Sequence, residues 1–206
     1  MNKTISAKLI LDSGRTFNVS LTEEEFNKIA KSVPLSTLKP GDVFSTGKRS
    51  WVVLDQGEQG TKVMLNDIFG FSKFDDASND WDSSHIRNRL IVDFLPRVEA
   101  EVNPDNIIAH KPDLSTDDGS DARSAEALWD KVSLISCNEY RKYRKFIPLA
   151  EYWYWTLTPV STTHALTGVR FVSSYGVLMD SDCDCGSGAI RPCCVFNPNI
   201  EVIKEN

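Results

Sequence analysis

The residues best suited to chemistry in this chain are four cysteines near the C-terminus. One residue separates Cys183 from Cys185, and Cys193 is followed directly by Cys194. Four thiolates could bind zinc tetrahedrally, but common zinc modules begin with two cysteines separated by two residues. Adjacent side chains on a strand also point to opposite faces, so the second pair could not easily share one ion. The spacing therefore favours buried thiols without a metal, and we expect no cofactor.

Carboxylates gather in three polar segments, which we expect to be loops. The clusters are Asp75, Asp76, Asp80 and Asp82; Asp113, Asp117, Asp118 and Asp121; and Asp180, Asp182 and Asp184. Calcium binds about six to eight oxygen ligands, and the sequence leaves open whether these loops supply them. We interpret the clusters as solvated loops that could present a negative surface to a basic partner, because such charge speeds association.

The histidines do not form a recognisable catalytic arrangement. His85, His110 and His164 are scattered, and the chain contains no G-x-S-x-G, P-loop, G-x-G-x-x-G or H-E-x-x-H motif. His164 follows an aromatic strand, and we expect it at the exposed rim of a loop. The sequence thus predicts a protein that is not an enzyme.

An aromatic run, Tyr152-Trp153-Tyr154-Trp155, reads as a strand whose side chains alternate between two faces. Exposed tyrosine or tryptophan could serve a sugar or a protein ligand as a contact platform. One pair should face the core and the other the surface.

Charge and composition exclude several classes of protein. The net charge of −6 disfavours direct binding to nucleic acid or to an anionic membrane. No apolar run approaches the roughly 18 residues of a membrane span, and residues 1–8 lack the apolar segment of a secretory signal. Five cysteines is an odd number, typical of reduced thiols. We expect a protein of the cytoplasm or of a virion; the oligomeric state stays open.

The first 34 residues predict a small β-β-α unit. Residues 8–20 read as a hairpin around a glycine turn. Thr22 and Glu25 have the spacing of a capping box, which indicates that a helix follows. Residues 33–40 contain two prolines and little pattern, so we expect a linker there.

Residues 38–206 predict one α+β domain with two main helices. The first should begin at Ser83 or Ser84 and should kink or end at Pro96. The second should begin after Ser136, which forms a capping box with Glu139.

The last quarter of the chain predicts an antiparallel meander. Residues 151–159, 168–172 and 188–192 read as consecutive short strands separated by turn residues. We therefore expect these three strands to pair in chain order.

Three motifs in this domain resemble an uncharacterised family of phage and Firmicutes proteins. They are W-x-x-S-x-I-R (Trp81, Ser84, Ile86, Arg87), W-W-L-x-x-P (Trp153, Trp155, Leu157, Pro159) and G-V-R-P (Gly188, Ile190, Arg191, Pro192). The chain departs from the family at Asn88 and Arg89, where relatives tend to have Trp and Leu, and at Cys193 and Cys194, where small or apolar residues are commoner. The resemblance places Trp153 and Trp155 in the core, which leaves Tyr152 and Tyr154 as the candidates for the surface. We expect Arg87 and Arg191 to be structural, binding backbone carbonyls or an internal carboxylate.

That family looks like a relative of the C-type-lectin-like fold, of its formylglycine-generating branch and of variable phage receptor-binding proteins. The resemblance implies ligand recognition by loops on a rigid scaffold. The loops would be residues 72–82, 111–121, 159–167 and 180–188. Within them and beside them we take Asp80, Asp82, Asp117, Asp118, Tyr154, His164, Asp182 and Asp184 as candidate binding residues. The leading hypothesis is a non-catalytic phage or prophage module that binds a protein or a glycan.

Two alternatives remain open from the sequence. The chain could be a phage-encoded intracellular inhibitor that sets its acidic loops against a basic groove of a host defence protein. It could also be a thiol-dependent enzyme of the formylglycine-generating type, using the cysteines between Cys183 and Cys194. The second alternative requires a reactive thiol with a depressed pKa.

Overall fold

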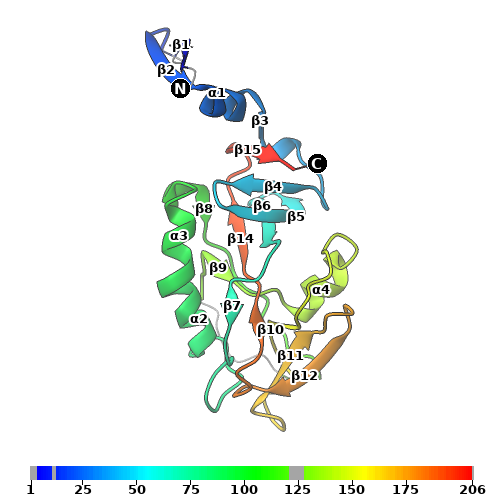
Figure 1. The fold of residues 1–206 in the computed structure, drawn as a ribbon. Coiled ribbons are helices and arrows are strands. Elements are labelled where there is room, and N and C mark those ends of the chain that lie inside the picture. Colours follow the sequence, from blue (N-terminus) through cyan, green and yellow to red (C-terminus); the bar gives the residue numbers. More distant parts are fainter. Residues whose placement is uncertain (1–3, 11–12, 121–127, 206) are drawn as a thin grey trace.

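The computed structural model describes residues 4–10, 13–120 and 128–205, and the described chain has an α+β fold (Figure 1). Asp121, one of the predicted acidic cluster residues, lies outside the described residues. The described strands form a two-stranded, a five-stranded and an eight-stranded sheet. The C-type-lectin-like assignment goes further than this architecture and is treated below as part of a proposal.

The N-terminal β-β-α unit projects from one end of the molecule (Figure 1). Strands β1 (Thr4–Ile10) and β2 (Thr16–Thr22) pair antiparallel, and helix α1 (Glu23–Ala30) follows. The predicted capping box is confirmed: the Glu25 amide donates to Thr22 Oγ1 at 3.2 Å, and the Thr22 amide donates to Glu25 Oε2 at 2.7 Å. None of the side chains that the structure describes in this unit is buried.

The expected linker is wrong, because residues 32–38 belong to the main domain. Strand β3 (Ser32–Pro34) pairs with the last strand, β15 (Glu201–Lys204), and the 3-10 turn η1 (Leu35–Thr37) follows. Leu35 is completely buried. The strand was not predicted because two prolines lie in or near it. Proline is nevertheless tolerated in edge strands such as β3.

The eight-stranded sheet carries most of the core. Its order is β3-β15-β4-β5-β6-β14-β8, and β9 also pairs with β14. The remaining bounds are β4 (Val43–Thr46), β5 (Arg49–Gly57), β6 (Gly60–Leu65), β8 (Ile107–Ile108, after the 3-10 turn η3, Pro104–Asn106), β9 (Val132–Ser133) and β14 (Cys193–Phe196). Both faces of its central strands are buried, since successive residues of β5 enter two different clusters.

One long helix covers the first of these faces. It consists of α2 (His85–Arg89), a π-helical turn η2 (Leu90–Phe94) and α3 (Leu95–Glu99), and Ser84 caps its start as predicted. Of the two alternatives expected at Pro96, the helix does not end there and continues to Glu99. In the π turn, the Leu95 amide bonds to the Leu90 carbonyl, and this wider backbone accommodates a proline that lacks an amide proton.

Helix α4 (Cys137–Tyr143) covers the opposite face, with Tyr140 and Tyr143 packed in the second cluster. Its predicted capping box is confirmed. The Glu139 amide donates to Ser136 Oγ at 3.0 Å, and the Ser136 amide donates to Glu139 Oε2 at 3.0 Å. Local sequence chemistry thus fixed the start of both main-domain helices.

The five-stranded sheet contains the meander, with one correction. Its order is β12 (Leu178–Asp182), β11 (Gly168–Val172), β10 (Tyr154–Pro159), β13 (Ala189–Ile190) and β7 (Gly70–Phe71). The third antiparallel strand is β12, whereas β13, which we expected in that place, lies on the other side of β10 and parallel to it. The chain returns across the sheet because β13 leads directly into β14.

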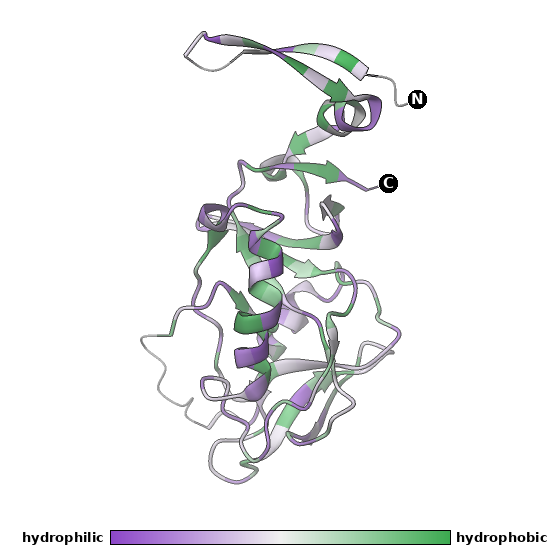
Figure 2. Ribbon diagram, turned by 60° about the vertical axis from the view of Figure 1, so that its left-hand side comes forward, coloured by the Kyte–Doolittle hydropathy of each residue, from purple (hydrophilic) through white to green (hydrophobic). Residues whose placement is uncertain are grey.

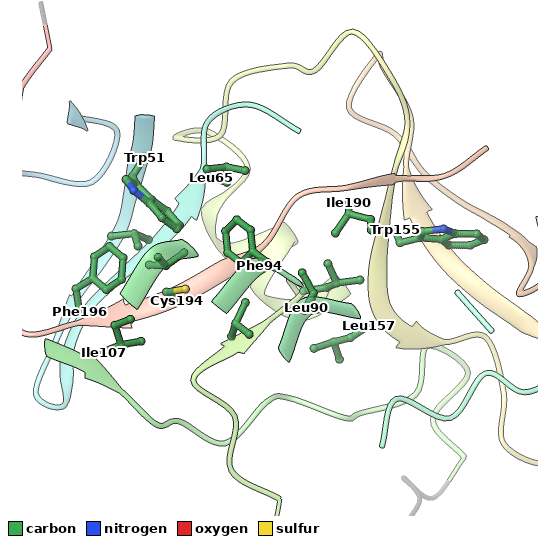
Figure 3. Close-up of a cluster of buried hydrophobic side chains, with 14 of the residues drawn as sticks. Trp51, Leu65, Leu90, Phe94, Ile107, Trp155, Leu157, Ile190, Cys194 and Phe196 are labelled. Carbon is green, nitrogen blue, oxygen red and sulfur yellow. The ribbon is translucent and has the colours of Figure 1, made fainter. Parts of the chain in front are cut away.

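The core runs without interruption from one sheet to the other. Figure 3 shows Trp51, Phe196 and Cys194 of the larger sheet on one side, and Trp155, Leu157 and Ile190 of the smaller sheet on the other. Leu90 and Phe94 of the long helix lie between these two groups. The aromatic strand β10 is therefore part of the core and not a surface platform.

Arg191 joins the two sheets at the point where β13 passes into β14. Its side chain is fully buried, with donations from Nε to the Leu65 carbonyl (2.8 Å), Nη1 to Pro148 (2.9 Å) and Nη2 to Asn66 (3.0 Å). The guanidinium also lies 5.3 Å from the ring centroid of Tyr154. Backbone carbonyls, not a carboxylate, thus satisfy this arginine.

Arg87 forms a second internal polar cluster, with Asp130 and Trp81. The guanidinium donates to Asp130 through Nη2 (2.8 Å) and Nε (3.1 Å), and Trp81 Nε1 donates to the same carboxylate at 2.9 Å. These hydrogen bonds raise the pKa of Arg87 above its ordinary value. The cluster ties the start of the long helix to the segment before β9.

Candidate functional site

The four loops expected to bind a ligand meet at one end of the molecule, opposite the N-terminal unit (Figure 1). The amides of residues 117 and 118 donate to the carbonyls of residues 159 and 160, at 3.1 and 3.3 Å. The amides of residues 74 and 75 donate to the carbonyl of residue 183, at 2.8 and 3.0 Å. We call this surface, made of residues 72–82, 111–120, 159–167 and 180–188, the loop end.

Asn79 holds two of these loops together, and the sequence analysis did not single it out. The side chain is completely buried, and Nδ2 lies 2.8 Å from the Ser161 carbonyl, 2.8 Å from Ala165 and 3.1 Å from Gly168. The backbone amide of Asn79 donates to the Leu166 carbonyl at 3.0 Å. A short polar residue in a loop gives no sequence signal for a partner more than eighty positions away.

Most of the candidate aspartates lie exposed at the loop end. Asp82, Asp118, Asp182 and Asp184 are exposed, and Asp80 is half-buried. Asp182 accepts a hydrogen bond from Thr167 Oγ1 at 3.0 Å, which links two of the loops. Hydrogen bonds from Ser120 lower the pKa of Asp118, so that this carboxylate is charged at neutral pH.

Asp117 differs from the other candidates because its carboxylate is engaged inside the protein. It accepts from Arg141 Nη2 at 2.6 Å and forms an ion pair with Arg170 Nη2 at 2.7 Å. Burial alone would raise the pKa of Asp117, but the two guanidiniums hold it below the ordinary value. We therefore revise its expected role from ligand contact to an anchor of the 111–120 loop on α4 and β11.

His164 is exposed in the 159–167 loop, as expected for a rim residue. Its Nδ1 lies 2.7 Å from Thr163 Oγ1, and its amide donates to Ser161 Oγ at 3.1 Å. Hydroxyl groups of the same loop thus hold this residue in place.

The expectation that Tyr154 faces the surface is wrong. Only 2% of the residue is exposed, and its burial raises the pKa of the phenol. Alternation predicts an exposed face only where one side of a sheet is solvated. Strand β10 has neighbours on both edges and clusters on both faces, with Trp155 in one and Tyr154 in the other. Tyr152, just before the strand, is 43% exposed.

No family model, no curated protein and no solved structure matches this chain. A proposal for its function therefore rests on the geometry of its own residues.

The cysteines near the C-terminus are dispersed among different environments. Cys193 and Cys194 point to opposite faces of β14, the first into the cluster below α4 and the second into the cluster below the long helix. Cys183 is buried and Cys185 is half-exposed. Within the described ranges, no group of three or more histidine, cysteine, aspartate or glutamate side chains could hold a metal ion.

Thiol reactivity should be confined to Cys185. Hydrogen bonds from Ser187 lower the pKa of its thiol, whereas burial raises the pKa of Cys193 to about 12. Because the thiolate is the reactive form, native alkylation followed by mass spectrometry should label Cys185 at least about tenfold faster than the buried cysteines. Cys185→Ser should remove the fast phase. Rapid labelling of Cys193 or Cys194 would contradict the burial of these two thiols.

Across the part of the chain that the structure describes, no helix is both long enough and apolar enough to cross a bilayer.

Proposed function

We propose that this chain is a non-catalytic recognition module of phage or prophage origin, which binds a protein ligand through the loop end. The observation that carries the proposal is the convergence of four loops, far apart in sequence, at one end of a well-packed domain. Loops on a rigid scaffold are the usual location of binding residues. The phage origin and the C-type-lectin-like fold rest on the three sequence motifs described above.

The charge of the loop end favours a basic ligand surface. Its exposed carboxylates include Asp76, Asp82, Asp118, Asp182 and Asp184. Opposite charge on a partner would raise the association rate and help to fix the orientation of the complex. Strands β3 and β15 lie at the other end of the domain (Figure 1), which leaves the loop end open to a large partner.

The same acidic surface supports one second candidate, an intracellular inhibitor of a host defence protein. Such an inhibitor would place the loop end in a basic groove, for example one that normally binds nucleic acid. Both candidates predict a protein partner, and the identity of that partner decides between them.

The direct experiment is to immobilise the purified protein and to identify by mass spectrometry what it retains from a lysate of its bacterial host. A stoichiometric basic protein that is released by high salt would support binding at the loop end, since salt screens exposed charges. Retention that is insensitive to salt, or no retained protein, would count against it.

Charge reversal should locate the contact. With the retained protein as ligand, Asp182→Lys combined with Asp184→Lys should raise Kd about tenfold or more, mainly through slower association. Asp105→Lys combined with Glu201→Lys changes the net charge equally, at exposed positions outside the loop end. This control should change Kd less than about twofold, and equal effects of the two pairs, measured by interferometry, would place the contact elsewhere.

A further inference from the structure

A groove lies on the face of the eight-stranded sheet that α4 covers only in part. Asp55, Lys62 and Val195 stand side by side on β5, β6 and β14, because each is the register partner of the next. Tyr143 of α4 donates to Asp55 at 2.6 Å, which places this row beside the helix. The groove over the row has a volume of about 440 Å³, within the usual range of roughly 300–1,000 Å³ for small-molecule sites.

An exposed tryptophan forms one wall of the groove. Trp129 is 52% exposed, and Lys111 lies over its ring with Nζ 5.4 Å from the centroid. The turn between β5 and β6 also lines the groove and contributes Glu58 and Gln59. An indole of this size in contact with water leaves a large apolar surface uncovered, and a ligand that stacked on it would remove that surface from water.

The floor of the groove is polar but has no excess of either charge. Lys62 is ion-paired with Glu139, and Asp55 with Lys142. His110 also lines the groove; burial lowers the pKa of its imidazole to about 4, so the ring is neutral near pH 7. Its Nε2 lies 3.0 Å from Ser133 Oγ, while its buried Nδ1 has no hydrogen-bond partner among the described residues.

These features select a neutral ligand with many hydroxyl groups. The lining contains two carboxylates, Asp55 and Glu58, and two ammonium groups, Lys62 and Lys111. Neither a phosphate nor a cationic side chain would find a net opposite charge. A sugar ring offers an apolar face for stacking and hydroxyls that both donate and accept, which matches an indole wall between carboxylate, amide and ammonium groups.

We infer that this groove binds a neutral saccharide, with one ring stacked on Trp129 and hydroxyl groups directed to Glu58 and Gln59. Of its lining residues only Lys111 belongs to the loop end. The site is therefore additional to the proposed protein-binding surface and does not depend on it.

The test is a titration of the full chain with neutral trisaccharides of glucose, galactose, mannose and N-acetylglucosamine, followed by saturation-transfer NMR. We expect millimolar or tighter binding of at least one probe. Trp129→Ala should weaken it about tenfold or more, as truncation of a stacking aromatic does, and Trp129→Phe should restore part of the loss. About half of Trp129 is buried, so Trp129→Ala should unfold at a somewhat lower temperature than the wild type. Trp129→Phe keeps most of the buried contact and should unfold close to the wild-type temperature, so its binding reports on stacking and not on folding.

Tyr175→Ala is the matched control, since Tyr175 is 85% exposed in the β11–β12 turn and does not line the groove. It should bind the probe like the wild type, as should the variant that combines Asp182→Lys with Asp184→Lys. Absence of binding by every probe at 10 mM, roughly the upper limit of useful affinity, would overturn the inference. So would undiminished binding by Trp129→Ala.

Discussion

Replacing Arg191 with methionine should lower the free energy of unfolding by about 3–5 kcal/mol. The variant keeps an apolar side chain of similar length but removes three charged donors from the carbonyls of Leu65, Asn66 and Pro148. A hydrogen bond to a charged group contributes about 1.5–3 kcal/mol, and water can partly replace those at the less buried carbonyls. Urea unfolding followed by far-UV circular dichroism gives the difference.

The effect should depend on burial and not on arginine chemistry in general. Arg144 makes fewer contacts of the same kind: Nη2 donates to the Gly176 carbonyl at 3.2 Å, and the guanidinium lies 5.9 Å from the Tyr140 ring centroid. Arg144, however, is exposed. Arg144→Met should therefore cost less than about 1 kcal/mol. A loss at Arg191 no larger than this would show that the junction between the sheets is not held by its guanidinium.

If Arg191→Met does not fold, Arg191→Lys provides an intermediate case. An ammonium group can reach one or two of the three carbonyls but cannot reproduce the planar fork. Its unfolding free energy should fall between those of the wild type and the methionine variant.

Features of the fold that depend on neighbours in sequence could be predicted. The capping boxes at Thr22 and Ser136 and the helix start at Ser84 each need only residues three positions apart. The opposite orientations of Cys193 and Cys194 follow from strand geometry alone. The motif arginines were expected to bind internal acceptors, but their partners could not be named because they lie 43 to 126 positions away.

Features that depend on the assembled sheets could not be predicted. The parallel pairing of β13 with β10 and the pairing of β3 with β15 join distant segments of the chain. Tyr154 was misplaced because alternation describes one strand, whereas burial depends on what covers each face of the sheet. The groove beside Trp129 could not be predicted for the same reason, because its floor forms only when β5, β6 and β14 pair in register.

The loop end contains both predictable and unpredictable features. The acidic loops were recognised from composition, and the structure brings them together. Asn79, which fixes their arrangement, and the internal ion pairs of Asp117 emerged only from the geometry. The charge of a loop can thus be predicted from the sequence. Which of its carboxylates remain exposed and which form internal ion pairs cannot.

Asp130 should be as important to stability as Arg191, although no motif contains it. Its side chain is only 2% exposed and accepts hydrogen bonds from Arg87 and Trp81. Asp130→Ala would leave a guanidinium without its main counter-charge and an indole N–H without an acceptor. Removing one partner of a buried ion pair costs about 3–5 kcal/mol, and we expect a loss in that range in urea unfolding.

Asp82→Ala is the matched control, because Asp82 forms an ion pair with the same arginine at 3.3 Å but its side chain is 60% exposed. An exposed pair contributes about 0–1 kcal/mol, so this variant should remain close to the wild type. Equal losses at the two positions would mean that Arg87 needs any nearby carboxylate and not the buried one. A large loss at Asp130 alone would show that Arg87 stabilises the fold through a buried partner 43 residues further along the chain, which anchors the long helix to the segment before β9.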